Sequence, residues 1–202
     1  MKSLCLCLQG NRLVHFFTLL QLGFGLKIRV GISVRDALIH ELGLEEESVQ
    51  KIQTVFLDGK AVDDLESTIV RDGSILALSA AMPGLVGATL RRGSVYAVMR
   101  SQITSTGRGD VACPMEGRVM LKIFNLLINE LGPILLAKGI LIEKDVLRGF
   151  LSEQPQDFWM NCEEARIDGR LVECETVQKI EWSDAEDIIS LEVEFSIPRE
   201  SK

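Results

Sequence analysis

The chain has 202 residues, of which 47% are hydrophobic and 25% are charged, a balance that excludes the apolar-poor, highly charged composition of disordered proteins. The net charge of −7 is uneven: residues 1–100 hold 11 basic and 10 acidic residues and sum to +1, while residues 101–202 hold 11 and 19 and sum to −8. Because the acidic half repels phosphate, nucleic acid is excluded as the partner of the whole chain.

The cysteines and the apolar stretches of the sequence indicate the cellular compartment. Five cysteines at irregular spacings argue against a secreted disulfide framework, namely Cys5, Cys7, Cys113, Cys162 and Cys174. The apolar stretches near the N-terminus are too short for an export signal or for a membrane span, which needs about 20 residues. We therefore expect a cytoplasmic protein that binds no membrane.

The first half of the chain predicts strands around one short helix. An apolar hairpin comes first, with strands at 12–22 and 26–32 on either side of two glycines. A helix over 34–42 follows, because apolar residues recur there at helical spacing. This helix has an N-cap serine, Ser33, and a glycine just past its end, Gly43.

Two Asp-Gly turns separate the strands that follow. The strand at 52–57 ends at Asp58-Gly59, a dipeptide typical of hairpins, and a short strand continues at Val62. Asp72-Gly73 then leads into a buried strand at 75–78. The resulting order of strand, strand, helix, strand, short strand and strand is that of the β-grasp, or ubiquitin-like, fold.

Four stretches carry a resemblance to a known family: Ser33 to Leu44, Phe56 to Val62, Val70 to Ile75, and Met82-Pro83-Gly84. With these residues the first half of the chain resembles the sulfur-carrier branch of the ubiquitin-like proteins, which includes the small subunit of molybdopterin synthase and the thiamine-biosynthesis sulfur carrier. In that family a terminal Gly-Gly pair carries the carboxylate that is adenylated and converted to a thiocarboxylate. Here Gly84-Leu85-Val86-Gly87 stands in that place and the chain continues, so the resemblance implies a sulfur-carrying tail only after cleavage behind Gly84 or Gly87.

The second half begins beyond residues 101–110, a Ser-, Thr- and Gly-rich stretch that predicts a linker. Apolar helices are predicted over 119–131 and 143–151. Strands are expected at 158–167, 171–182 and 188–197. An Asp168-Gly169 hairpin turn joins the first two, and the last alternates apolar with acidic residues.

We therefore predict an α+β protein of two domains. Residues 1–100 are expected to form the β-grasp domain. Residues 111–202 are expected to form a smaller α+β domain of unknown family, with apolar helices on an antiparallel sheet.

No residue pattern indicates catalysis, a metal or a cofactor, and we predict none of the three. Cys5 and Cys7 fall short of a zinc site, which needs four ligands, and His15 and His40 are the only histidines. Paired carboxylates such as Glu163-Glu164 can perform acid-base chemistry, but strand alternation favours a solvated sheet face for most of the acidic residues.

The candidate binding residues are therefore surface residues. The segment from Met82 through Pro83, Gly84 and Leu85 to Gly87 is apolar and lies where the family's tail emerges; the alternative is an ordinary connection between elements. Lys60, Arg91 and Arg92, with Arg100, are candidates for a patch that binds phosphate or an acidic partner, or that contacts the acidic second domain.

Three functional hypotheses follow. The first is a non-catalytic β-grasp protein that binds another protein through its first domain, while the second domain completes the surface or mediates self-association. The second is a sulfur-carrier-like protein cut after Gly84 or Gly87. The third is an enzyme with a site between the domains that uses acidic residues or a cysteine.

Overall fold

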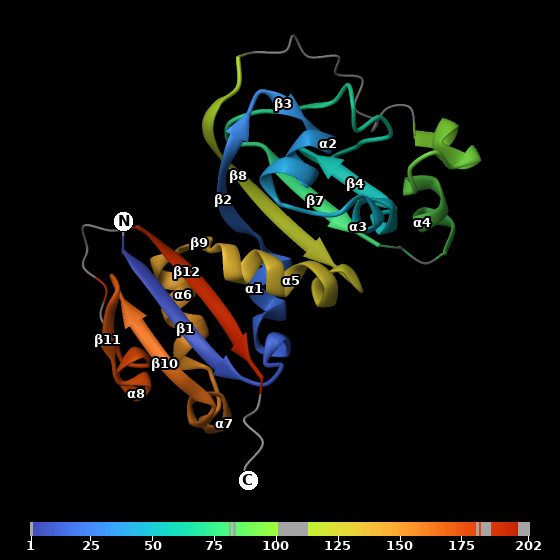
Figure 1. Cartoon of the computed structure of the whole chain (residues 1–202). Coiled ribbons are helices and arrows are strands. Elements are labelled where there is room, and N and C mark those ends of the chain that lie inside the picture. Colours follow the sequence, from blue (N-terminus) through green and yellow to red (C-terminus); the bar gives the residue numbers. More distant parts are fainter. Residues whose placement is uncertain are drawn as a thin grey trace. The chain divides into compact units, whose positions relative to one another are not determined.

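The computed structural model has a mixed α+β architecture and describes residues 2–80, 82, 84–100, 113–180, 182 and 187–197, with only the backbone at 97–99 (Figure 1). The chain forms two compact units. We call Met1–Leu19 with Asn129–Lys202 the terminal unit and Leu20–Ile128 the central unit. Among the described helices, none has the length and hydropathy needed to cross a bilayer.

The central unit contains a five-stranded mixed sheet. Its strands lie in the order β2 (Phe24–Val30), β8 (Met115–Phe124), β7 (Ile75–Ser79), β4 (Thr54–Leu57) and β5 (Lys60–Ala61). β8 runs antiparallel to β2 and parallel to β7, and β4 runs antiparallel to both of its neighbours. Figure 1 shows β8 between β2 and β7, two strands that come much earlier in the chain.

One helix packs against this sheet, and its position was predicted. It consists of α2 (Val34–Asp36) and η2 (Ala37–Glu41), and η2 contacts β2. The side-chain oxygen of Ser33 accepts a hydrogen bond from the backbone N–H of Asp36 at 3.0 Å, which confirms the N-cap. Gly43, with φ +74°, ends the helix as expected. The other elements of this unit are β3 (Ile32–Ser33), α3 (Glu46–Lys51), β6 (Ile69–Val70), α4 (Gly84–Leu90) and η3 (Val95–Arg100).

The strands of the terminal unit lie in the order β11 (Arg170–Val172), β10 (Cys162–Ile167), β1 (Ser3–Gln9), β12 (Ile188–Ser196) and β9 (Ile140–Glu143). β1 is parallel to β12 and antiparallel to β10, so the two ends of the chain share one sheet. In Figure 1 the blue β1 lies between the red β12 and the orange β10. The remaining helices are η1 (Leu13–Phe16), α1 (Phe17–Leu22), α5 (Leu127–Lys138), α6 (Lys144–Ser152), α7 (Gln156–Met160) and α8 (Cys174–Val177).

The hairpin turns predicted at Asp58-Gly59 and at Asp168-Gly169 are both confirmed. Asp58 and Gly59 adopt φ values of +51° and +76° between β4 and β5, and Asp168 and Gly169 adopt +49° and +76° between β10 and β11. Positive φ at both central positions is the geometry that asparagine, aspartate and glycine tolerate. The dipeptides therefore fixed these two turns from local chemistry alone.

The predicted first hairpin is wrong, because residues 13–22 are helical. Leu13, Phe16 and Leu20 are buried at spacings of three and four, which is a helical pattern. Gly23, with φ +112°, ends this helix, and β2 pairs with β8 in place of the expected partner.

The predicted helix over 119–131 is also wrong in its first half. Val119, Leu121 and Ile123 are buried in alternation along β8, and the helix α5 begins only at Leu127. Further along, residues 156–160 and 174–177 are helical, which leaves only the short strands β10 and β11 from the predicted strands at 158–167 and 171–182.

The units divide the chain differently from the expected domains at 1–100 and 111–202. β1 belongs with the C-terminal residues because Leu4, Leu6 and Leu8 join the buried row of β12. The same parallel pairing makes the sheet mixed, whereas an antiparallel sheet was predicted. The linker expected at 101–110 lies outside the described residues.

Candidate functional site

The predicted binding segment leads into α4, the first of two short helices that follow β7. The helices α4 and η3 contact each other and leave large apolar side chains in solvent. The exposed fraction is 68% for Leu85, 66% for Val86, 83% for Val95 and 48% for Tyr96. We call these four residues, together with Arg91, the α4–η3 surface. Grouped exposed apolar side chains are typical of sites that bind another macromolecule.

Two glycines shape the entry into α4. Gly84 is exposed and has φ +77°, a conformation that disfavours other residues. Gly87 is buried, and a Cβ atom added there would lie 1.7 Å from the backbone oxygen of Met82. Gly87 is therefore needed for the close approach of α4 to the chain that enters it. Pro83 lies outside the described residues.

Arg92 attaches this segment to the end of α3. Its guanidinium donates hydrogen bonds to the carbonyl oxygen of Ile52 at 2.8 and 3.1 Å and to the carbonyl oxygen of Val49 at 3.3 Å. Its backbone N–H donates a hydrogen bond to the carbonyl oxygen of Gln53 at 2.8 Å. Burial lowers the pKa of Arg92, and the charge of Asp63 opposes that shift. A cation at these terminal carbonyls also complements the helix dipole.

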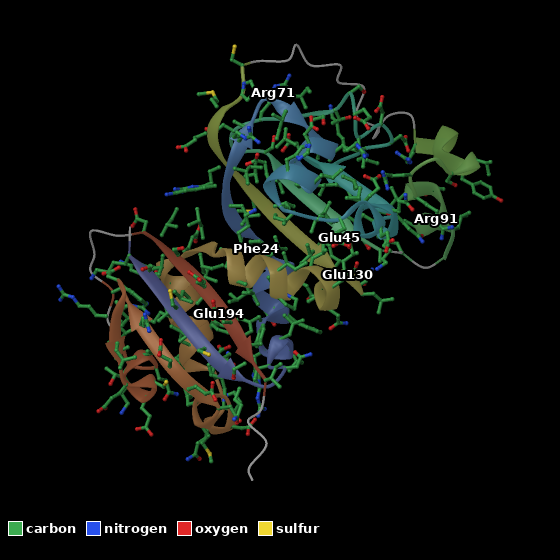
Figure 2. The ribbon with its side chains drawn as sticks, in the orientation of Figure 1. Phe24, Glu45, Arg71, Arg91, Glu130 and Glu194 are labelled. Atoms are coloured by element: carbon green, nitrogen blue, oxygen red, sulfur yellow. The ribbon has the colours of Figure 1, made fainter. Side chains whose placement is uncertain are left out.

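Arg100 attaches the other end of the segment. Its side chain is only 2% exposed, and its guanidinium lies 2.5 Å from Oδ1 of Asp63 and 2.5 Å from the carbonyl oxygen of Thr89. The predicted basic patch therefore divides in two. Arg92 and Arg100 are occupied in holding α4 and η3, whereas Arg91 is exposed at the end of α4, where Figure 2 labels it. Lys60 is exposed on β5, beyond the Asp58-Gly59 turn.

A shallow groove in the central unit was not predicted. Its volume is about 410 Å³, and Arg35, Glu46, Val49, Gln50, Asp63, Asp64, Leu65, Glu66 and Arg92 line it. Arg35 lies 2.5 Å from an oxygen of Glu46 and 3.0 Å from one of Glu66. Both lining arginines are thus engaged by protein groups, so the groove offers little to an anionic ligand. The opposite charges of Arg35 and Glu46 were visible in the sequence, but no spacing rule pairs residues 11 positions apart on two separate helices.

Cys5 and Cys7 lie on β1, on the side opposite its buried leucines. The thiol of Cys5 lies 3.6 Å from a carboxylate oxygen of Glu192, and that of Cys7 lies 3.8 Å from one of Glu163. Burial raises the pKa of both thiols, and these carboxylates raise it further because they oppose a second negative charge. Both thiols are consequently poor nucleophiles near neutral pH.

The acidic sheet face predicted for 188–197 is present on β12. Ile189, Leu191 and Val193 are buried, whereas Glu194, labelled in Figure 2, is exposed. Residues 20–128 hold 12 basic and 12 acidic residues, so the whole net charge of −7 belongs to the terminal unit. Within the described ranges, no group of three or more His, Cys, Asp or Glu side chains has a geometry that could hold a metal ion.

Comparison of the chain with models of known families, with curated proteins and with solved structures finds no match. The functional interpretation therefore depends on the residues and contacts described above.

The first prediction concerns Arg100. In Arg100→Met the Asp63 carboxylate and the Thr89 carbonyl lose their buried partner. The free energy that holds α4 and η3 in place should fall by about 2 to 4 kcal/mol. Amide hydrogen exchange in 84–96 should accelerate at least about tenfold while β7 changes little. Arg91→Met, which alters an exposed arginine, is the control and should leave exchange unchanged. Equal exchange in the two variants would contradict a structural role for Arg100.

The second prediction concerns thiol reactivity. In the native chain near neutral pH, iodoacetamide should alkylate the exposed Cys113 before Cys5 and Cys7, whose thiols have raised pKa values, as followed by peptide mass spectrometry. Their alkylation should quicken as the pH rises, because a larger fraction becomes thiolate. Glu192→Gln keeps the shape of the side chain but removes its charge, so Cys5 should react a few-fold faster, and Glu116→Gln serves as the matched control. An unchanged Cys5 rate in Glu192→Gln would show that this carboxylate has no influence.

Proposed function

We propose that this chain is a non-catalytic protein that binds another protein through the α4–η3 surface of a β-grasp-like central unit. The observation that carries the proposal is that two helices in contact with each other, held by the buried Arg100 and the half-buried Arg92, leave four large apolar side chains exposed. Partner recognition at protein interfaces commonly centres on apolar and aromatic anchors with an arginine nearby. Tyr96 and Arg91 are of these types.

The strand order supports the β-grasp part of the proposal. Taken cyclically from β8, the larger elements are β8, β2, the α2–η2 helix, β4, the short β5 and β7. That order is strand, strand, helix, strand, short strand and strand. The strand that begins the fold in the β-grasp order would then be the last strand of the central unit, after α4 and η3. Such a circular permutation leaves the pairing of the sheet unchanged.

The third prediction tests the surface directly. The double variant Leu85→Asp/Val95→Asp places two charges on side chains that are exposed, so the fold should persist while a partner's apolar contact is lost. Leu171→Asp changes a residue of the terminal unit that is equally exposed, at 70%, and is the matched control. Each tagged chain is expressed in its native cell, cross-linked and purified.

A protein recovered with the wild-type chain should fall more than about tenfold in the double variant and persist in the control. Circular dichroism verifies that all three chains are folded. Recovery of the same protein in equal amounts from both variants, or of none with the wild type, would contradict the proposal.

A sulfur-carrier role is the second candidate, and one observation favours it. In the cyclic strand order, β7 is the strand that ends the family's fold, and Gly84 and Gly87 follow it directly. Cleavage there is the condition for a free glycine carboxylate. Two features oppose cleavage in the folded chain, since Gly84–Leu90 is helical and Gly87 is buried against Met82.

The fourth prediction decides this candidate. After a cut behind Gly84, β8 in the second fragment would still pair with β2 and β7 in the first fragment. In the same way, β1 in the first fragment would still pair with β10 and β12 in the second. The fragments should therefore co-elute on gel filtration and separate only in denaturant. Denaturing mass spectrometry of protein from its native cell would show two fragments if the chain is a sulfur carrier. Intact 22.4 kDa chains alone would remove this candidate.

A further inference from the structure

Two thiols of the terminal unit lie next to each other. Cys162 is the first residue of β10 and Cys174 is the first residue of α8. The β10–β11 hairpin reverses the chain between them, with Ala165 opposite Val172, and α8 packs back against β10. Residues 12 positions apart in sequence thereby meet at one end of the hairpin.

The contacts of the two sulfur atoms are specific. The thiol of Cys174 donates to the carbonyl oxygen of Cys162 at 3.2 Å, and the thiol of Cys162 donates to the carbonyl oxygen of Glu164 at 3.6 Å. Both side chains are half-buried, and both cysteines are in the free thiol form. This arrangement differs from that of Cys5 and Cys7, whose thiols contact the carboxylates of Glu192 and Glu163.

We infer that Cys162 and Cys174 are a redox-active pair that closes to an intramolecular disulfide when a low-molecular-weight disulfide is the oxidant. The bond would connect the start of α8 to the start of β10 and so fix the hairpin at the edge of the sheet. Crosslinks of this kind stabilise a fold by restricting its unfolded chain.

The exchange proceeds in two balanced steps. The Cys174 thiolate attacks one sulfur of the small disulfide, which forms a mixed disulfide and releases one small thiolate. The Cys162 thiolate then attacks the Cys174 sulfur, which closes the protein disulfide and releases the second small thiolate. The two protons given up by the cysteines are taken up by the two released thiolates, and the two electrons reduce the small disulfide.

The pair is slow to react near neutral pH. Burial raises the pKa of Cys162 well above that of a free thiol, and the neighbouring Cys174 side chain raises it further. Since the thiolate is the attacking species, closure should quicken as the pH rises. The pair is therefore expected to respond to sustained oxidation, not to brief exposure.

The fifth prediction tests this pair on the full chain, reduced and then incubated with oxidised glutathione at mildly alkaline pH. A non-reducing peptide map should contain a Cys162–Cys174 crosslinked peptide that is lighter than the two free peptides by about 2 Da, the mass of the two hydrogens lost. In Cys162→Ser that peptide should disappear and Cys174 should retain glutathione. Cys5→Ser is the matched control and should keep the crosslink.

A second readout needs no cysteine variant. Oxidised wild-type chain should unfold at a higher urea concentration than reduced chain, and reduction with dithiothreitol should reverse the shift. A map that contains only glutathione adducts, a Cys5–Cys7 bond or bonds between chains would overturn the inference.

Discussion

The pairing of β8 with both β2 and β7 is the interaction on which the central unit depends. β8 matches seven residues of β2 and five of β7, and Leu121 and Ile123 on it are fully buried. Without β8 each neighbour would expose a row of unpaired backbone groups along one edge. The chain after β7 must therefore leave the sheet and return to it as β8. The helices α4 and η3 belong to that excursion, so the sheet determines where they begin.

Local chemistry made part of this fold predictable. Ser33 and Gly43 bound the helix, and Asp58-Gly59 and Asp168-Gly169 form their hairpins, because each of these features depends only on neighbouring residues. The pairing of β1 with β12 and that of β8 with β2 were not predictable in this way. Both strands find partners more than 80 residues away in the sequence, and strand periodicity does not specify the partner of a strand. The helix at 13–22 was missed because its many apolar residues also satisfy a strand pattern.

The candidate binding segment was chosen from the sequence, but its conformation was not predicted. The sequence shows that Met82 to Gly87 is largely apolar and that arginines follow soon after it. These two facts fit a loop, a tail or a helix equally well. Arg91, Arg92 and Arg100 have the same charge, yet only the first is exposed. The difference arises from carbonyl oxygens at the end of α3 and from Asp63, which come near only when the chain is folded. Exposure, which separates a binding residue from a structural one, is a tertiary property.

The contrast between buried arginines and exposed apolar residues is the strongest argument for a binding role. Removing the Arg100 guanidinium from water is costly, and Asp63 and the Thr89 carbonyl offset that cost only in a fixed geometry. A connection that merely links β7 to β8 gains nothing from such an arrangement. A surface whose side chains must meet a partner does gain, because order established before binding lowers the entropy lost on binding. Arg92 and Arg100 face inward, whereas Leu85, Val86, Val95 and Tyr96 remain in water, which is the reverse of the usual preferences of these residue types. The proposed protein partner would cover these apolar side chains.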